Sequence, residues 1–225
     1  MSLWNLFLLG GYVMWPILLC SIIAVYIIIE RFLVLKKAKA NVSQFMLNLK
    51  VLLRKNDIRS AIDLCDNVKA PVSRILKQGI LRYNRGHQVI REAIENAGSE
   101  EIYKLEKGLS ILATIAGIAP LLGFFGTVTG IIQAFQMIQN AGGVVNAGDL
   151  AGGIWEALLT TAFGLFVGIP AYFFYNYFVN RIKRFVFEIE SSSNEFLDLI
   201  QLESEEIKNT NTAEANEKFQ PITLK

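Results

Sequence analysis

Long apolar blocks alternate with amphipathic segments along this chain. The first block, Leu6–Ile29, has 24 residues without a charge, and residues 108–180 run for 73 residues without Lys, Arg or His. A helix rises about 1.5 Å per residue, so about 20 apolar residues cross a hydrocarbon core of about 30 Å. The first block therefore predicts one membrane span, and the second predicts two spans joined by a link at residues 142–149.

A secretory signal peptide is the alternative interpretation of the first block. Such a peptide carries a basic segment, then a short apolar core that ends in small residues. Here no residue before Arg31 is basic, and the block ends in the large residues Tyr26–Ile29. We therefore favour a retained membrane span.

Two further segments place apolar side chains at helical spacing. In residues 36–107 these side chains are Val51, Leu52, Ile58, Ala61, Ile62, Leu64 and Cys65, followed by Val72, Ile75, Leu76, Ile80 and Leu81. After the third span they are Phe185, Ile189, Phe196, Leu199 and Ile200. Beyond about Ile207 the sequence is polar, and residues 185–225 together carry 9 acids against 3 Lys, so we expect a disordered tail.

These patterns predict an all-α membrane protein with three transmembrane helices and helical extensions. The predicted segments are an N-terminus with the first span (1–35), a helical domain (36–107), the second and third spans (108–180), a helical extension (181–207) and a disordered tail (208–225). All 22 Lys and Arg lie outside residues 1–30 and 108–180. By the positive-inside rule, the basic segments are cytoplasmic, and the N-terminus and the link are periplasmic.

Composition also argues against several classes of function. Residues 36–107 hold 15 Lys and Arg against 8 Asp and Glu, and beside a membrane this charge favours anionic lipid heads over nucleic acid. The sequence contains no Gly-rich phosphate loop, metal-ligand cluster or nucleophile–base pair, so we expect no enzyme activity, cofactor or metal. His87 lies in a polar turn, and Cys20 and Cys65 fall in different predicted compartments.

The second and third spans contain small residues, hydroxyls and one carboxylate. Glycine and proline positions predicted to serve helix packing are Gly123, Gly126, Gly130, Gly164, Gly168, Pro120 and Pro170. We expect these small faces to permit contacts between subunits. Glu156 is unlike them, because a charge at bilayer depth is costly and marks a functional site. Spacing by four places Glu156 and Thr160 on one helix face, with Thr161 about 100° round from Thr160.

The spans lack a basic partner for Glu156, so we expect a titrating group from another subunit. The ordered run of Pro-Leu-Leu-Gly, Gly-Thr-Val, Gly-Ile-Trp-Glu-Ala-Leu, Thr-Thr-Ala-x-Gly-Leu and Ile-Pro-Ala lies at residues 120–171. At these residues the chain resembles the ExbB/TolQ/MotA proton-channel family. Three spans and a short external N-terminus are similar to its ExbB/TolQ branch.

The resemblance implies a homopentameric ring in the bacterial inner membrane, enclosing two single-span partner helices of the ExbD or TolR type. A membrane Asp of the partner carries the proton, Thr127 and Thr161 line the ring interior, and Glu156 lies on the path. We add Thr160 to this predicted path and leave the role of Thr129 open. The implied work is iron-complex uptake or envelope maintenance, through a TonB- or TolA-like energy transducer.

Three other functions remain as alternatives. A stator for gliding or another motility motor would use nearly identical membrane residues. A scaffold that assembles partners without conducting is a different class, and the retained Glu156, Thr127 and Thr161 argue against it. A small-molecule transporter is disfavoured because three spans without an inverted repeat do not form the usual transporter architecture.

Overall fold

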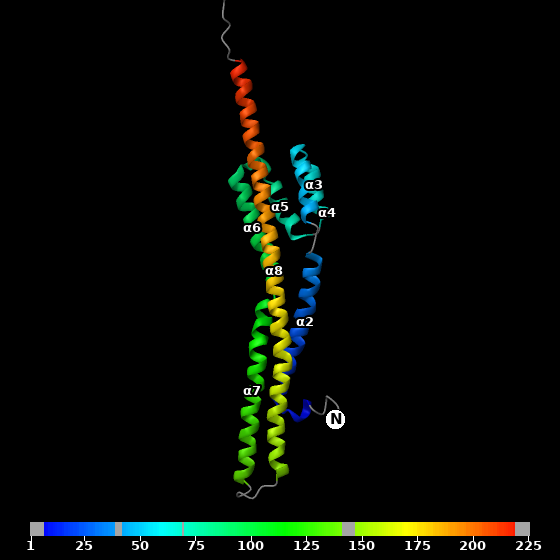
Figure 1. Ribbon diagram of the computed structural model, residues 1–225, viewed down its shortest axis with the longest axis vertical. Coiled ribbons are helices and arrows are strands. Elements are labelled where there is room, and N and C mark those ends of the chain that lie inside the picture. The colour runs from blue at the N-terminus through cyan, green and yellow to red at the C-terminus, as the bar shows by residue number, and fades with distance from the viewer. Residues whose placement is uncertain (1–6, 39–41, 69, 141–146, 219–225) are drawn as a thin grey trace, which may run out of the picture. The chain divides into compact units, whose positions relative to one another are not determined.

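The computed structural model describes residues 7–38, 42–68, 70–140 and 147–218, and their regular secondary structure is helical (Figure 1). The elements are α2 (Met14–Ala38), α3 (Val42–Arg54), α4 (Ile58–Asn67), α5 (Pro71–Ile80), the 3-10 turn η1 (Tyr83–Arg85), α6 (His87–Glu106), α7 (Leu109–Asn140) and α8 (Ala147–Lys218). Three stretches, in α2, α7 and α8, are long and apolar enough to cross a membrane. The predicted all-α membrane fold with three spans is confirmed.

The chain divides into two compact units. The membrane unit comprises Met1–Val34 and Glu106–Arg181, and the amphipathic unit comprises Leu35–Leu105 and Ile182–Lys225. Between α6 and α7, Gly108 adopts φ +81°, a left-handed conformation that few residues other than glycine adopt. A regular α-helix cannot run through this residue, so α6 and α7 are separate helices.

The first membrane helix begins later than the apolar pattern predicts. We expected the span to start at Leu6, whereas α2 starts at Met14. Gly11 has φ +68°, which interrupts helical geometry, and Pro16 lies in the first turn of α2, where its missing N–H costs no helical hydrogen bond. Hydropathy alone does not predict this interruption of the helix at Gly11, because glycine is common in apolar segments.

The other end of the fold differs from the prediction in the opposite direction. We expected disorder from residue 208, but α8 continues to Lys218. No Gly or Pro occurs between residues 171 and 220, and helix formers such as Ala213, Glu214 and Ala215 lie in this stretch. The structure describes residues 208–218 as helix, and disorder of the tail stays a prediction. Residues 219–225 and most of the predicted link, residues 142–146, lie outside the described residues.

The amphipathic unit has its own apolar core, in which the continuation of α8 packs with α3, α4, α5 and α6. Its buried residues are Phe45, Met46, Leu49, Leu53, Ala61, Cys65, Val72, Ile75, Leu76, Ile80, Ile90, Ile94, Ile189, Phe196, Leu197 and Ile200. Most of the residues in the two predicted apolar sets are buried or partly buried. Val51 and Leu81 instead remain 53% and 52% exposed.

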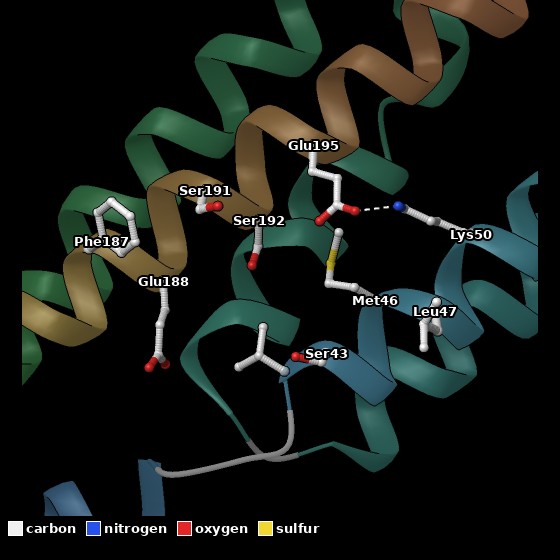
Figure 2. A pocket seen from close by; sticks show the side chains of 10 residues that line it. Ser43, Met46, Leu47, Lys50, Phe187, Glu188, Ser191, Ser192 and Glu195 are labelled. Atoms are coloured by element: carbon white, nitrogen blue, oxygen red, sulfur yellow. Dashed lines mark ion pairs between the residues drawn. The ribbon is translucent and has the colours of Figure 1, made fainter.

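A groove of about 570 Å³ lies between α3 and α8 within the amphipathic unit. Figure 2 shows Lys50 of α3 pairing with Glu195 of α8 beside the thioether of Met46. Exposed ion pairs contribute little free energy of folding, about 0–1 kcal/mol. The buried stripe of Ile189, Phe196 and Ile200 therefore supplies most of the attachment of α8 in this unit.

Helix α4 begins with a side-chain cap. The Ser60 N–H donates to Asp57 Oδ1 at 3.1 Å, and this hydrogen bond holds the pKa of the Asp57 carboxyl below its ordinary value. Because the carboxylate form is favoured in the folded chain, the cap stabilises the folded state above the ordinary Asp pKa. That stabilisation is lost as the pH falls through the lowered folded-state pKa.

We expect Asp57→Ala to lower the melting temperature of the detergent-solubilised chain at neutral pH, because the α4 N-terminus loses its cap. Asp57→Asn retains a capping oxygen without an ionisable group, so its melting temperature should depend less on acid pH than that of the wild type. Circular dichroism melts across the acid range measure both effects. Identical pH profiles for the wild type and Asp57→Asn would contradict this account of the cap.

Candidate functional site

Helices α7 and α8 run side by side in the membrane unit (Figure 1). Their backbones touch at glycines. A Cβ atom added to Gly164 would lie 2.6 Å from the Ala119 carbonyl oxygen and 2.9 Å from Gly123 Cα. One added to Gly130 would lie 2.8 Å from the Gly153 carbonyl oxygen. Any side chain at these positions would force the helices apart.

Two further glycines make room for side chains across the same contact. A Cβ on Gly126 would lie 2.3 Å from Thr160 Oγ1, and a Cβ on Gly168 would lie 2.5 Å from Pro120 Cγ. Pro170 is exposed on α8. The small-residue faces that we expected between subunits thus pack inside one chain.

The close approach brings two hydroxyl groups together. Thr127 Oγ1 on α7 hydrogen bonds with Thr161 Oγ1 on α8. Thr127 also lies 3.2 Å from the Ala157 carbonyl oxygen, and the Thr161 hydroxyl donates to the Gly123 carbonyl oxygen at 3.1 Å. Both threonine residues are half-buried, in contrast to the fully buried Thr160.

The Thr127–Thr161 pair has more hydrogen-bond acceptor oxygens within reach than it has hydroxyl protons. Each threonine carries one hydroxyl proton, whereas the two carbonyl oxygens and either hydroxyl oxygen can accept. The two protons can therefore be arranged in more than one way without breaking the packing of the helices. A group of this kind can accept a hydrogen bond from one side and donate one to the other.

Thr160 lies in a different environment from its neighbour Thr161. Its side chain is 0% exposed and faces Gly126, and its hydroxyl donates within α8 to the carbonyl oxygens of Glu156 and Ala157 at 3.1 and 2.9 Å. Thr129 likewise donates within its own helix, to the Gly126 carbonyl oxygen at 3.0 Å. The hydroxyls of Thr160 and Thr129 thus bond within their own helices, whereas those of Thr127 and Thr161 also bond across the α7–α8 contact.

Glu156 lies half-buried on α8, one turn before Thr160. Its carboxyl group contacts the backbone of the turn that precedes α2. A Cβ atom built on Gly11 would lie 1.9 Å from Glu156 Oε1 and 2.8 Å from Glu156 Cδ. The structure thus brings Glu156 against an N-terminal glycine, a neighbour that the sequence reasoning did not include.

Two sequence signals were available for the residues that we missed. The Gly10-Gly11 pair interrupts the first apolar block just before Pro16, which favours a turn there. Gly153 precedes Glu156 by three residues and packs against Ala134 and the Gly130 carbonyl oxygen. Neither signal identifies its partner helix. Among the residues that the structure describes, no group of three His, Cys, Asp or Glu side chains could hold a metal ion.

Comparison with known proteins shows the family of the chain. Residues 67–191, more than half of the chain, match the MotA/TolQ/ExbB proton channel family. The chain belongs to this family. The matched residues include the α7–α8 contact with Thr127, Thr161 and Glu156, whereas Gly11 lies outside them.

Several relatives carry ExbB names. The chain is 31% identical over 188 residues to the biopolymer transport protein ExbB of Neisseria meningitidis, covering 77% of this chain and 82% of the relative. It is 32% identical over 168 residues to exbB1 of Vibrio cholerae, covering 72% of each chain. An ExbB-like protein of Synechocystis is 31% identical over 170 residues, covering 75% of this chain and 81% of the relative. The chain is therefore a multi-pass inner-membrane protein of a proton-channel family that includes biopolymer transport proteins.

The glycine contact predicts a clear difference between two alanine variants. Gly164→Ala should destabilise the folded chain by about 1–3 kcal/mol, because its Cβ meets backbone atoms of α7 that move only with the helix. Gly117→Ala is the matched control, since Gly117 lies on α7 with nothing within 4 Å of its added Cβ. Thermal unfolding in the same detergent compares the two. Equal melting temperatures would contradict close α7–α8 packing.

Proposed function

We propose that this chain is the proton-channel subunit of an ExbB–ExbD or TolQ–TolR type motor, which couples the proton motive force to work in the periplasm or at the outer membrane. The observation that carries the proposal is the half-buried Thr127–Thr161 hydroxyl pair at the α7–α8 contact, in the same unit as Glu156. Hydroxyl groups pass or stabilise a proton without the cost of a permanent charge at bilayer depth.

The proposed path comprises Thr127, Thr161 and Glu156. We leave Thr160 out of it, because its hydroxyl is fully buried and bonded within α8. Residues 108–180 supply no Lys, Arg or His, so a carboxyl group on a partner helix is the proposed proton carrier. That partner is a single-span subunit of the ExbD or TolR type.

The proposed assembly is a ring of five copies around two partner helices. Support comes from the large apolar side chains that the membrane unit leaves exposed, because lipid or other helices must cover them. They include Leu19, Ile22, Leu121, Phe124, Phe135, Phe166 and Ile169. Five identical subunits cannot present identical surroundings to two helices at the same time. Protonation of one helix would then favour a step of the ring relative to the pair.

The driving force is sufficient for such a step. A potential of about 100 mV is worth about 2.3 kcal/mol for each proton that crosses the membrane. A TonB- or TolA-like transducer is the proposed recipient of this work. Iron-complex uptake and envelope maintenance are the processes that this arrangement serves.

In the proposed topology the N-terminus is periplasmic, and residues 36–107 and 181–225 are cytoplasmic. The support is the confinement of Lys and Arg to these segments and to Arg31. Residues 36–107, with 15 Lys and Arg against 8 Asp and Glu, also favour contact with anionic lipid heads at the inner face of the membrane.

Removing the hydroxyl groups tests the proposed path. We expect Thr127→Val or Thr161→Val to lower the proton flux by at least about tenfold, because a tenfold change in rate is about 1.4 kcal/mol, comparable to the loss of one buried hydrogen bond. The chain is reconstituted with its single-span partner in vesicles, and flux under an imposed potential is followed with an internal pH dye.

Thr114→Val is the matched control for this experiment. Thr114 also lies on α7, is exposed, and its hydroxyl donates to the Ser110 carbonyl oxygen of the same helix at 2.9 Å. This variant should conduct as the wild type does, and native mass spectrometry should give the same ring for all three variants. Wild-type flux in both Thr127→Val and Thr161→Val would rule out the path.

A thiol label tests the proposed topology. Ser43→Cys places a thiol on an exposed position of α3, in a Cys20→Ser background. Cys65 should stay silent, because burial raises the pKa of its thiol to about 12. An impermeant reagent should label Ser43→Cys only after the inner membrane is permeabilised. Labelling in cells with an intact inner membrane and an open outer membrane would show that the orientation is opposite to the proposed one.

A further inference from the structure

The turn before α2 lies against the Glu156 carboxyl group and is held in place by contacts of its own. Val13, Met14 and Ile17 are each at most 3% exposed, so the residues that follow Gly11 are anchored in the membrane unit. The Met14 N–H donates to the Gly11 carbonyl oxygen at 3.3 Å, and the rings of Phe7 and Trp15 meet edge to face at 5.3 Å. Contacts on both sides of Gly11 thus hold its backbone in place.

Two independent features require glycine at residue 11. Its φ of +68° is a conformation that other L-residues adopt at a cost. Its missing side chain leaves the space that Glu156 Oε1 occupies, since a Cβ atom would lie only 1.9 Å away. The Gly11 backbone and the end of the Glu156 side chain are therefore in direct van der Waals contact.

We propose that Gly11 is a positioning residue for Glu156: the anchored turn lies against the carboxyl group and limits its movement toward the N-terminal side. This inference rests on the proposed function of Glu156 in proton transfer. It assigns a role to a segment outside residues 67–191, which carry the match to the family. A carboxyl group held in this way loses less side-chain freedom when it exchanges a proton with a partner helix.

The inference predicts a change in the reactivity of one carboxyl group. In Gly11→Ala, the new methyl group displaces the Glu156 carboxyl toward its open side. Labelling of Glu156 by a hydrophobic carbodiimide should then become severalfold faster, as measured by peptide mass spectrometry on the full-length chain with its partner. Proton flux in the same vesicles should fall, because the displaced carboxyl is no longer prearranged.

Gly108→Ala is a matched control for backbone strain. Gly108 has a similar positive φ, +81°, and belongs to the same unit, but its added Cβ would make only an ordinary contact of 3.6 Å with Ile27 Cγ2. This variant carries the conformational cost without touching Glu156. Its carbodiimide labelling of Glu156 should match the wild type. Equal acceleration in both variants would attribute the effect to strain and overturn the inference.

Shortening the carboxyl side chain provides a rescue. Glu156→Asp withdraws the carboxyl group by one methylene, so the loss of thermal stability caused by Gly11→Ala should be smaller in the Glu156→Asp background than in the wild type. If the losses of thermal stability in Gly11→Ala and Glu156→Asp are additive in the double variant, the inference is overturned. If Gly11→Ala alone does not fold, folding of the double variant supports the inference and failure of the double variant overturns it.

These measurements separate the inference from the proposed function. Suppose that the wild-type complex conducts no protons, but Gly11→Ala speeds labelling and the stabilities are non-additive. The positioning role of Gly11 would then stand, and the proton path would be rejected. Unchanged labelling with additive stabilities, in a complex that conducts, would reject the positioning role and retain the path.

Discussion

The side-to-side contact of α7 and α8 is the constraint on which the membrane site depends. In a bilayer the helices gain little from excluding apolar surface, so close packing must supply the attraction. Glycines at residues 123, 126, 130 and 164 let the two backbones approach until carbonyl oxygens and Cα atoms touch. Only at this separation can the Thr127 and Thr161 hydroxyls reach each other and the carbonyl oxygens of the opposite helix.

The cost of charge in the membrane explains the chemistry of the site. Residues 108–180 carry Asp149 and Glu156 as their only ionisable acids and no base. Neutral hydroxyls therefore provide the polar groups at the α7–α8 contact, and the Glu156 carboxyl lies against the Gly11 backbone at one side. Because residues 108–180 contain no basic group, the proposed motor takes its proton carrier from the partner helix.

Helix α8 takes part in both units, and its two parts are stabilised differently. In the membrane unit its glycines and Thr160 fit against α7 by shape. In the amphipathic unit its stripe of Ile189, Phe196, Leu197 and Ile200 is buried in a core with α3, α4, α5 and α6. There water supplies the hydrophobic driving force, and the Lys50–Glu195 pair at the groove adds mainly orientation.

The sequence by itself determined the three spans, the helical class and the family, because hydropathy, helical periodicity and an ordered motif are properties of the linear chain. It also singled out Thr127, Thr161 and Glu156 as polar groups in apolar spans. Only the tertiary structure decided that Thr160 packs against Gly126 while Thr161 meets Thr127, that the small-residue faces join helices of one chain, and that Gly11 touches Glu156. Periodicity assigns a residue to a face of its own helix, but it contains no information on the rotation and register of the helix opposite, and those two quantities select every pair in the site.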